Sequence, residues 1–271
     1  MIPFTKAHAC GNDFLIVTEE AAADCDWANL ARGLCARHTG IGADGIEFFA
    51  WTGAKTGRIR LRNADGSMAE ISGNGTRCVA AWMAEALGSQ PGDALEIATD
   101  AGVRVCRIEA RRGRAVEVTA GMGVPTFEPK TLTVLDEMIV HGTVVSTGNP
   151  HFVMVVDDAR FKLGNWEWRS VGAEICTHSD FPNGTNVEFL HVAGPREIEI
   201  RIWERGVGPT SSSGTGSSAA ATAAIALGLA GSPLTVVAPG GAQTVAWNGP
   251  GTELKLAGPA ALIARGEAWY G

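Results

Sequence analysis

The stretch "ISGNGTRCVAAWMAEALG" at residues 71–88 returns in altered form as "SSGTGSSAAATAAIALG" at residues 212–228. Each copy contains Ser-Gly-x-Gly, continues with small and apolar residues, and ends at a glycine. Gly88 and Gly228 are typical of the position just after a helix C-terminus. The two copies predict helices over residues 77–88 and 217–228. Because these segments are apolar on nearly every side, we expect both helices to be buried.

The repeat extends beyond the helices at a constant offset of 141 residues, which is the separation of Ser72 from Ser213. "GIEFF" (45–49) matches "NVEFL" (186–190), and "RIRLRNADG" (58–66) matches "EIRIWERGV" (199–207). At a slightly shorter offset, "GNDFLIV" (11–17) resembles "GNPHFVMVV" (148–156). Matches in one order along the chain indicate duplication. We therefore predict two similar halves, residues 1–120 and 121–260, with a last strand at 261–271 that returns to the first half.

Each half is expected to consist mainly of strands. Short β-branched or alternating segments bounded by Gly, Asp or Pro predict strands at 58–62, 116–122, 144–148, 152–158, 197–204 and 234–239. Residues 111–117 and 129–137 are expected to be surface connections. The fold class that follows is α+β, with two pseudo-symmetric halves, each a barrel-like sheet wrapped around its own Ala-rich helix.

Composition excludes several classes of function. The net charge is −7, and no Lys/Arg cluster opposes it, which argues against a nucleic-acid partner. No apolar run approaches the length of a membrane span, and the first residues lack the pattern of a signal peptide. The six cysteines show no zinc-ligand spacing. We therefore expect a cytoplasmic protein with free thiols, no metal and no membrane partner.

The two Gly-rich loops are candidate anion sites. A loop that enters a helix presents unpaired backbone N–H groups at the positive end of the helix dipole. The third glycine of the dinucleotide fingerprint is missing and no Gly-Lys-Ser/Thr follows, so neither nucleotide motif applies. Taken singly, Ser72 and Ser213 are explained as N-caps. Taken as a pair, the loops suit binding of one carboxylate, with proton transfer on both sides of an amino-acid α-carbon.

Polar residues at the expected strand ends fit a zwitterionic ligand. Amides and Arg can bind carboxylates, and Glu can bind an ammonium group. Each Asn taken alone is equally a turn residue, and His151 is either a core histidine or a group that tunes a neighbouring acid. The candidates are Asn12, Asn63, Asn149, Asn186, Glu204 and Arg205, with Glu204 at the position that Asn63 holds in the first half.

Six motifs spread over about 200 residues resemble, in order, those of the diaminopimelate epimerase family. They are "AHACGNDF", "HTGIGADG", "NADGSMAEISGNGTRC", "STGNPHFV", "NGTNVEF" and "RIWERGVGPTSSSGTGSSAAA". The resemblance implies two pseudo-symmetric halves, an active site in the cleft between them, no cofactor and a homodimer. It also implies conversion of LL- to meso-diaminopimelate, on the route to lysine and peptidoglycan.

The resemblance assigns roles to the candidate residues. It places Ser72 and Ser213 at the two acid/base positions, with His151 and Glu204 tuning them. The substrate-binding residues that it implies are Asn12, Asn63, Gly73, Asn74, Asn149, Asn186, Glu204, Arg205, Gly214 and Thr215.

The sequence departs from the family pattern at the acid/base positions, where family members have cysteine. A serine hydroxyl is a far weaker acid than a thiol, so a serine base needs an adjacent general base. Pro209 also replaces the usual Glu. Two alternatives therefore stay open: a racemase, dehydratase or isomerase of the wider fold acting on another small acid, or a catalytically impaired homologue, natural or engineered, that binds diaminopimelate.

Overall fold

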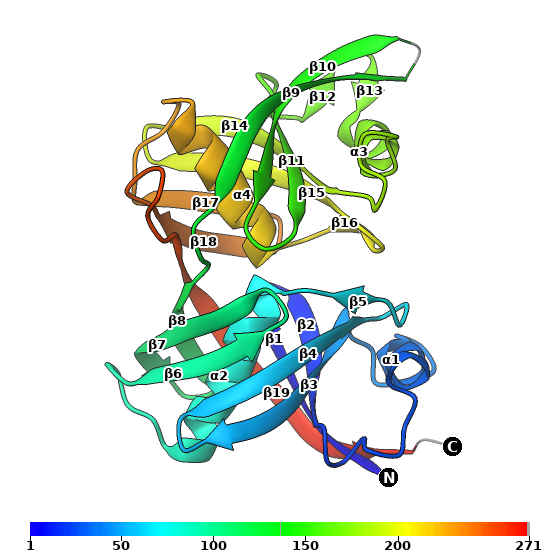
Figure 1. Ribbon diagram of the computed structural model, residues 1–271, viewed down its shortest axis with the longest axis vertical. Helices are drawn as coiled ribbons and strands as arrows, with labels where there is room; N and C mark the ends of the chain where they lie inside the picture. The colour runs from blue at the N-terminus through cyan, green and yellow to red at the C-terminus, as the bar shows by residue number, and fades with distance from the viewer. Residues whose placement is uncertain (136, 270–271) are drawn as a thin grey trace. The chain divides into compact units, whose positions relative to one another are not determined.

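Helices α2 (Gly73–Leu87) and α4 (Gly214–Ala226) are the two helices that the repeat predicts. In the computed structural model, which describes residues 1–135 and 137–269, most residues of both helices are buried. Each begins directly after its serine, several residues earlier than expected. The chain divides into two compact units, Met1–Gly121 with Ala257–Gly271, and Met122–Leu256 (Figure 1). One central helix belongs to each unit.

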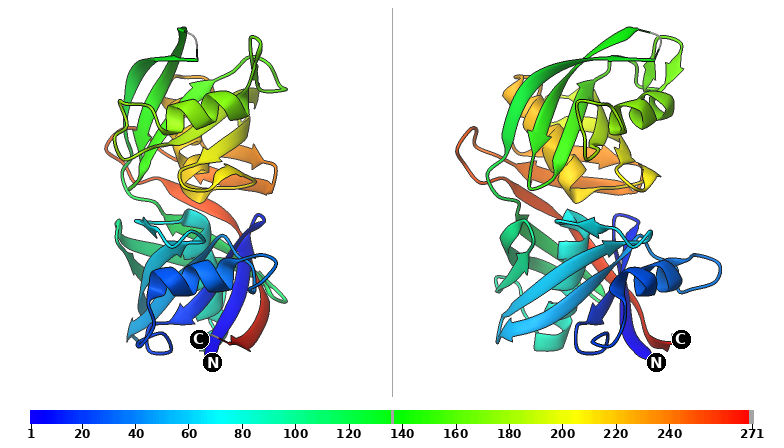
Figure 2. Two further views of the ribbon diagram at one scale, coloured as in Figure 1. Left: turned by 90° about the vertical axis from the view of Figure 1, so that its right-hand side faces the viewer. Right: turned by 45° about the vertical axis from the view of Figure 1, so that its right-hand side comes forward.

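The sheet of the first unit closes on itself around α2. Its strands pair in the order β1, β2, β3, β4, β6, β7, β8, β19, and β19 pairs with both β8 and β1. Both views of Figure 2 show β19 beside β1. The bounds are Ile2–Ala9, Asn12–Thr18, Gly45–Gly53, Thr56–Asn63, Ala94–Thr99, Gly102–Arg112, Ala115–Gly121 and Lys255–Ala268, with short β5 (Met68–Ala69) beside β4.

The strands of the second unit likewise pack against its central helix, α4. Its strands pair in the order β9, β10, β11, β14, β15, β17, β18. Their bounds are Thr126–Val134, Met138–Ser146, Pro150–Val155, Asn186–Gly194, Glu197–Glu204, Leu234–Ala238 and Gly241–Ala246. Short β16 (Gly208–Thr210) pairs with β15, and β12 (Lys162–Leu163) with β13 (Trp166–Glu167). The α+β fold with a buried helix in each half is confirmed.

Two further helices, α1 (Trp27–Cys35) and α3 (Trp168–Cys176), are absent from the sequence prediction. They begin at the same offset as the serines and bury one face each, α1 against β3 and β4 and α3 against β14 and β15. Asp26 caps α1 by accepting hydrogen bonds from the N–H groups of Ala28 and Asn29. An Asp before an apolar-periodic segment is a helix-start signal that could have revealed α1.

The expected surface connections are partly wrong. Residues 129–134 belong to β9, which pairs with β10 along its whole length, and residue 136 lies outside the described residues. Residues 111–117 contain only a short turn, with β7 ending at Arg112 and β8 beginning at Ala115. In β9 the exposed residues Thr131 and Thr133 alternate with buried Leu132 and Val134, as expected for a paired strand with one face toward solvent. No helix in residues 1–135 and 137–269 is long and apolar enough to cross a membrane.

Candidate active site

Ser72 and Ser213 occupy equivalent positions, each the N-cap of its unit's central helix. Both have extended backbone, with φ −121° and ψ 121° at Ser72 and φ −143° and ψ 129° at Ser213. Ser72 Oγ accepts the Gly75 N–H at 3.0 Å, and Ser213 Oγ accepts the Gly216 N–H at 3.0 Å. Each hydroxyl oxygen therefore lies at the positive end of a helix.

The residues that follow each serine form the first turn of its helix. Their backbone N–H groups have no carbonyl partner within the helix, so they can bind an anion. All four of these residues are buried, and burial strengthens the attraction between a bound anion and the helix dipole. They are Gly73 and Asn74 in α2, and Gly214 and Thr215 in α4.

In the second unit, a hydrogen-bonded chain leads from Ser213 to a buried carboxyl group. Ser213 Oγ lies 3.3 Å from Thr215 Oγ1, which accepts from Asn149 Nδ2 at 3.4 Å. Asn149 Oδ1 lies 2.9 Å from His151 Nε2, and His151 Nδ1 lies 2.8 Å from Glu188 Oε1. The predicted residues Asn149, His151, Ser213 and Thr215 thus come together.

His151 and Glu188 are both fully buried. With Nε2 donating to the Asn149 carbonyl oxygen, His151 Nδ1 and Glu188 share one proton, and the pair is neutral overall. Neutrality matters because an unpaired charge at such a site is costly. The imidazole is therefore a group that can pass a proton to or from this carboxyl.

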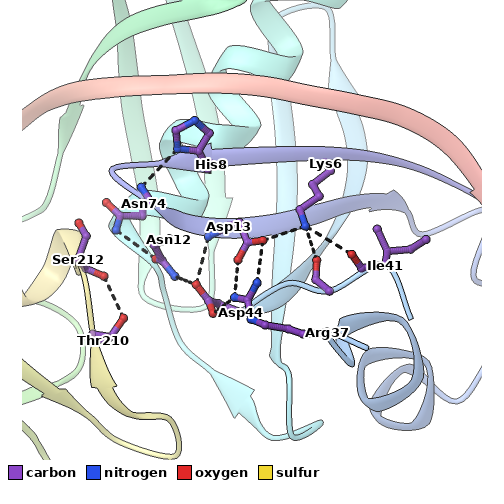
Figure 3. Close-up of polar contacts among 12 residues, drawn as sticks. Lys6, His8, Asn12, Asp13, Arg37, Ile41, Asp44, Asn74, Thr210 and Ser212 are labelled. Atoms are coloured by element: carbon purple, nitrogen blue, oxygen red, sulfur yellow. Dashed lines mark hydrogen bonds and ion pairs between the residues drawn. The ribbon is translucent and has the colours of Figure 1, made fainter. Parts of the chain in front are cut away.

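In the first unit, a chain of hydrogen bonds between side-chain amides connects the start of α2 to the turn between β1 and β2 (Figure 3). Asp44 Oδ2 accepts from Asn12 Nδ2 at 2.6 Å. Asn12 Oδ1 accepts from Asn74 Nδ2 at 3.1 Å, and Asn74 Oδ1 accepts from Arg77 at 2.6 Å. A carboxylate at one end and a guanidinium at the other orient both amides, because each charge selects the complementary amide group.

Ion pairs hold the acidic end of this chain. Asp13 lies 3.0 Å from Lys6 and 2.8 Å from Arg37, and Arg37 also lies 2.7 Å from Asp44 (Figure 3). Burial alone would raise the pKa of Asp13, but the hydrogen bonds and positive charges of Arg37 and Lys6 lower it. Asp13 therefore stays charged at neutral pH and balances the two cations. The sequence analysis did not identify this cluster.

The remaining candidates lie at strand ends. Asn63 ends β4 and donates to Ser67 Oγ at 3.0 Å. Asn186 begins β14, donates to the Pro150 carbonyl at 2.9 Å, and accepts the Arg205 N–H at 3.0 Å. Glu204 ends β15. The Asn186 amide thus fixes the backbone next to Glu204, which positions the Glu204-Arg205 pair.

Two buried glutamates are functional candidates that the sequence analysis did not select. Glu47 in β3 and Glu188 in β14 are 0% exposed. Neither Glu47 oxygen, nor Glu188 Oε2, has a hydrogen-bond partner among the described residues. Burial, with a smaller contribution from the charge of Asp100, raises the pKa of Glu47 to about 8. An acidic residue inside the matching apolar segments "GIEFF" and "NVEFL" was the available signal.

The cysteines provide no obvious replacement base. All six are free thiols, as expected. Cys78 lies within α2, and burial raises its pKa far above the usual range; burial also raises the pKa of Cys106 to about 12. In the part of the chain that the structure describes, no group of three His, Cys, Asp or Glu residues could hold a metal ion.

The comparisons with known proteins agree with this geometry. The family model of diaminopimelate epimerase matches residues 4–128 and 143–263. A diaminopimelate epimerase of Pelotomaculum thermopropionicum is 37% identical over 98% of this chain and 99% of its own length.

Solved structures show the same fold at lower identity. A predicted epimerase from Pseudomonas aeruginosa superposes with a TM-score of 0.76 at 18% identity, over 98% of this chain and 99% of that one. A probable proline racemase from Agrobacterium radiobacter, with bound carbonate, gives a TM-score of 0.75 at 15% identity, over 98% and 92% of the two chains.

Proposed function

The chain belongs to the diaminopimelate epimerase family, and on that premise we propose that it inverts an amino-acid α-carbon without a cofactor. The substrate proposed is LL-diaminopimelate and the product is the meso form, in lysine and peptidoglycan biosynthesis. The enzyme class is isomerase. The observation that carries the proposal is the equivalent placement of Ser72 and Ser213, each at the N-cap of a buried helix.

In the proposed reaction, one serine removes the α-proton and the other supplies a proton on the opposite face. The first-turn N–H groups of both helices, at Gly73, Asn74, Gly214 and Thr215, bind the α-carboxylate. This binding also favours reaction, because the charge that develops on the carboxylate during proton removal lies at the helix N-termini.

The polar side chains orient the rest of the substrate. Amide groups and Arg205 bind carboxylate oxygens, and Glu204 binds an ammonium group. The amide residues proposed for this role are Asn12, Asn63, Asn149 and Asn186. His151 tunes the acid/base group of its unit through the chain that begins at Ser213.

Serine in place of a thiol is the main chemical difficulty for turnover. A thiol is already partly ionised near neutral pH, whereas a serine hydroxyl is not. Two alternative readings follow from this difference: action on another small acid, or binding of diaminopimelate without inversion.

Exchange of the α-proton in D2O, followed by NMR, tests the proposal. LL-diaminopimelate, other amino acids and proline analogues are incubated separately with the protein. Exchange with diaminopimelate alone supports the proposed substrate, and exchange only with another acid contradicts it. Ser72→Ala and Ser213→Ala are the matched negative controls, since each should lower inversion by about 10²–10⁴-fold.

Binding without exchange would identify an impaired homologue. The double variant Ser72→Cys with Ser213→Cys then decides between substrate and chemistry. Exchange by that variant would show that the pocket is correct and that only the bases are missing. If the thiol variant neither binds nor exchanges diaminopimelate, the substrate assignment is wrong.

We also propose a cytoplasmic homodimer, because the family resemblance implies one. Neither a nucleic acid nor a membrane is proposed as a partner. Size-exclusion chromatography with light scattering tests the oligomeric state: a mass of about twice 28.2 kDa supports the dimer, and a mass near 28.2 kDa contradicts it.

A further inference from the structure

Each proposed acid/base serine has a buried carboxyl group beside its helix turn. Glu47 and Glu188 stand at equivalent positions of β3 and β14, separated by the same 141 residues as Ser72 and Ser213. Both are 0% exposed. A buried acid is costly to keep in an apolar strand. Its occurrence next to both serines therefore calls for a reason other than packing.

Glycines at the third helical position let the carboxyl groups approach the serines. A Cβ atom placed on Gly75 would lie 1.9 Å from Glu47 Oε1 and 3.2 Å from Ser72 Cβ. A Cβ on Gly216 would lie 2.7 Å from Glu188 Oε1 and 3.2 Å from Ser213 Oγ. The carboxyl oxygen and the serine thus border the same small space in both units.

The hydrogen bonding leaves both groups available for proton transfer. Ser72 Oγ and Ser213 Oγ accept backbone N–H groups, and Thr215 can be the donor in its contact with Ser213 Oγ, so each serine hydroxyl proton can pass to another acceptor. At least one oxygen of each Glu has no partner among the described residues. A buried carboxyl oxygen without a partner carries the cost of its lost hydration, so a hydrogen bond from a serine hydroxyl to that oxygen would be strongly favourable.

We propose, on the basis of the function proposed above, that Glu47 and Glu188 are the proton-holding partners of Ser72 and Ser213, and that they make serine competent where thiols usually act. Each transfers a proton across the space that a side chain on Gly75 or Gly216 would fill. Both act through a serine and not on the substrate, so they are positioning residues.

The protons of one inversion balance: Glu188 ends with one proton more and Glu47 with one fewer, and proton exchange with water restores both before the next inversion in the same direction. The α-carbon–hydrogen bond breaks and its proton passes to Ser213 Oγ, while the Ser213 hydroxyl proton passes to Glu188. On the other face, the carbanion takes the Ser72 hydroxyl proton, while the carboxyl proton of Glu47 passes to Ser72 Oγ. The reverse reaction runs each transfer backwards.

The environments of the two carboxyl groups suit this direction. Glu47 has no hydrogen-bond partner among the described residues and is held uncharged by burial, so it begins as the acid. Glu188 lies 2.8 Å from His151, and with their shared proton on the imidazole the carboxylate can accept the Ser213 proton at Oε2, which has no partner among the described residues. One side thus starts as a proton donor and the other as a proton acceptor, as a two-base inversion requires.

The test compares Glu47→Gln and Glu188→Gln in two backgrounds, the serine enzyme and the Ser72→Cys/Ser213→Cys variant. The measurement is α-proton exchange of LL- and meso-diaminopimelate in D2O. In the serine enzyme each Gln variant should lower exchange by at least about 10²-fold. In the thiol background the loss should be less than about threefold, because a thiol at a helix N-terminus ionises without a carboxylate.

Glu199→Gln, on β15, is the matched control and should leave exchange unchanged in both backgrounds. Folding of every variant is checked by thermal unfolding. Activity of Glu47→Gln in the thiol background itself shows that Gln is tolerated. If Gln lowers exchange equally in both backgrounds, the glutamates are structural and the proposal is overturned.

Two other outcomes separate this proposal from the proposed function. If only the thiol variant exchanges diaminopimelate, the pocket assignment holds, but the carboxyl groups do not activate serine and the proposal fails. If neither protein binds or exchanges diaminopimelate, the proposed function fails, and the proton-transfer proposal is overturned with it.

Discussion

The two units place the same carboxyl group in different electrical surroundings. Glu188 in the second unit contacts a fully buried histidine at 2.8 Å, whereas Glu47 in the first unit has no hydrogen bond from the described residues. The sheet registers explain the difference. His151 pairs with Asn186, and its counterpart in the first unit, Phe14, pairs with Gly45.

The residue at this one position, Phe14 or His151, therefore decides how the buried glutamate of each unit is neutralised. The imidazole lets Glu188 share a proton within a neutral pair. The phenyl ring offers no donor, so burial keeps the proton on Glu47 itself. The two units thus have the same strand arrangement around the glutamate. Phe14 leaves Glu47 as an isolated acid, whereas His151 makes Glu188 part of an acid–base pair.

Replacing the histidine is expected to have the largest effect on stability. His151→Phe makes the second unit resemble the first and removes the partner of a fully buried Glu188. Loss of one partner of a buried pair should lower the free energy of unfolding by about 3–5 kcal/mol at pH 8. Denaturant unfolding of His151→Phe, with and without Glu188→Gln, measures this effect.

The loss should shrink in the Glu188→Gln background, because no carboxylate is then left without its partner. His141→Phe, at an exposed site on β10, is the control and should change stability little. An equal loss for His151→Phe with and without Glu188→Gln would show that packing, and not the unpaired carboxyl, is responsible.

Glu47→Gln should have the next largest effect, and it depends on pH. The folded state keeps a proton on Glu47 up to about pH 8, whereas the unfolded chain releases it near the ordinary value of 4.5. Folding therefore binds a proton in this window, and the free energy of unfolding falls as pH rises from about 4.5 to 8.

Gln cannot ionise, so in Glu47→Gln this contribution to the fall of the free energy of unfolding with rising pH is absent. Relative to the natural residue, it should be more stable by a few kcal/mol at pH 8 and similar at pH 4.5. Urea unfolding across this range measures the difference. Parallel stability profiles for the two proteins would contradict an uncharged Glu47 in the folded state.

The glycines give a smaller and unequal pair of effects. Gly75→Ala places a methyl group 1.9 Å from Glu47 Oε1, and Gly216→Ala places one 2.7 Å from Glu188 Oε1. We expect Gly75→Ala to lower stability by about 1–3 kcal/mol through overpacking. At Gly216 the better helix propensity of Ala, worth about 1 kcal/mol, should offset most of the milder contact.

Thermal unfolding of the two variants side by side measures this contrast. Gly33→Ala in α1 is the control, because its added Cβ meets no atom within 4 Å, and it should stabilise the protein. Equal losses at Gly75 and Gly216 would show that the carboxyl groups move aside equally in the two units.

The smallest effect is expected at the paired outer helices. Asp26 accepts two backbone hydrogen bonds at the start of α1, whereas Glu167 at the start of α3 makes no side-chain cap. Asp26→Ala should cost about 1 kcal/mol, and Glu167→Ala should cost almost nothing. Chemical denaturation distinguishes them, and equal costs would mean that the Asp26 cap contributes nothing.

Periodicity and the repeat predicted the parts of the fold that depend on local pattern. The central helices and seven strands (β4, β8, β10, β11, β15, β17 and β19) were found because each pattern is set by burial of apolar side chains around α2 and α4, and the other strands were not predicted. Helices α1 and α3 were missed because they are short and only partly apolar. Strand β9 was mistaken for a connection because most of its side chains face solvent.

Within the candidate site, the serines and the glycines of the loops were visible because they form a motif. The contacts among Asn149, His151 and Glu188 were not predictable, because they depend on the register between β11 and β14. The pairing of Asp13 with Lys6 likewise depends on the register between β1 and β2, and its pairing with Arg37 on how the segment after α1 lies against them. An acid within an apolar strand is indicated by sequence, but its protonation is decided by the side chain opposite it.

The closure of the first sheet by β19 has a consequence for the order of events during synthesis. Residues 122–256 form a contiguous unit that can fold as soon as it leaves the ribosome. The first unit, although translated earlier, needs the pairing of Ile2 with Ala268 to complete its sheet. Its sheet therefore closes between two segments that the whole second unit separates in sequence, so the first unit is completed only after the second unit has been synthesised.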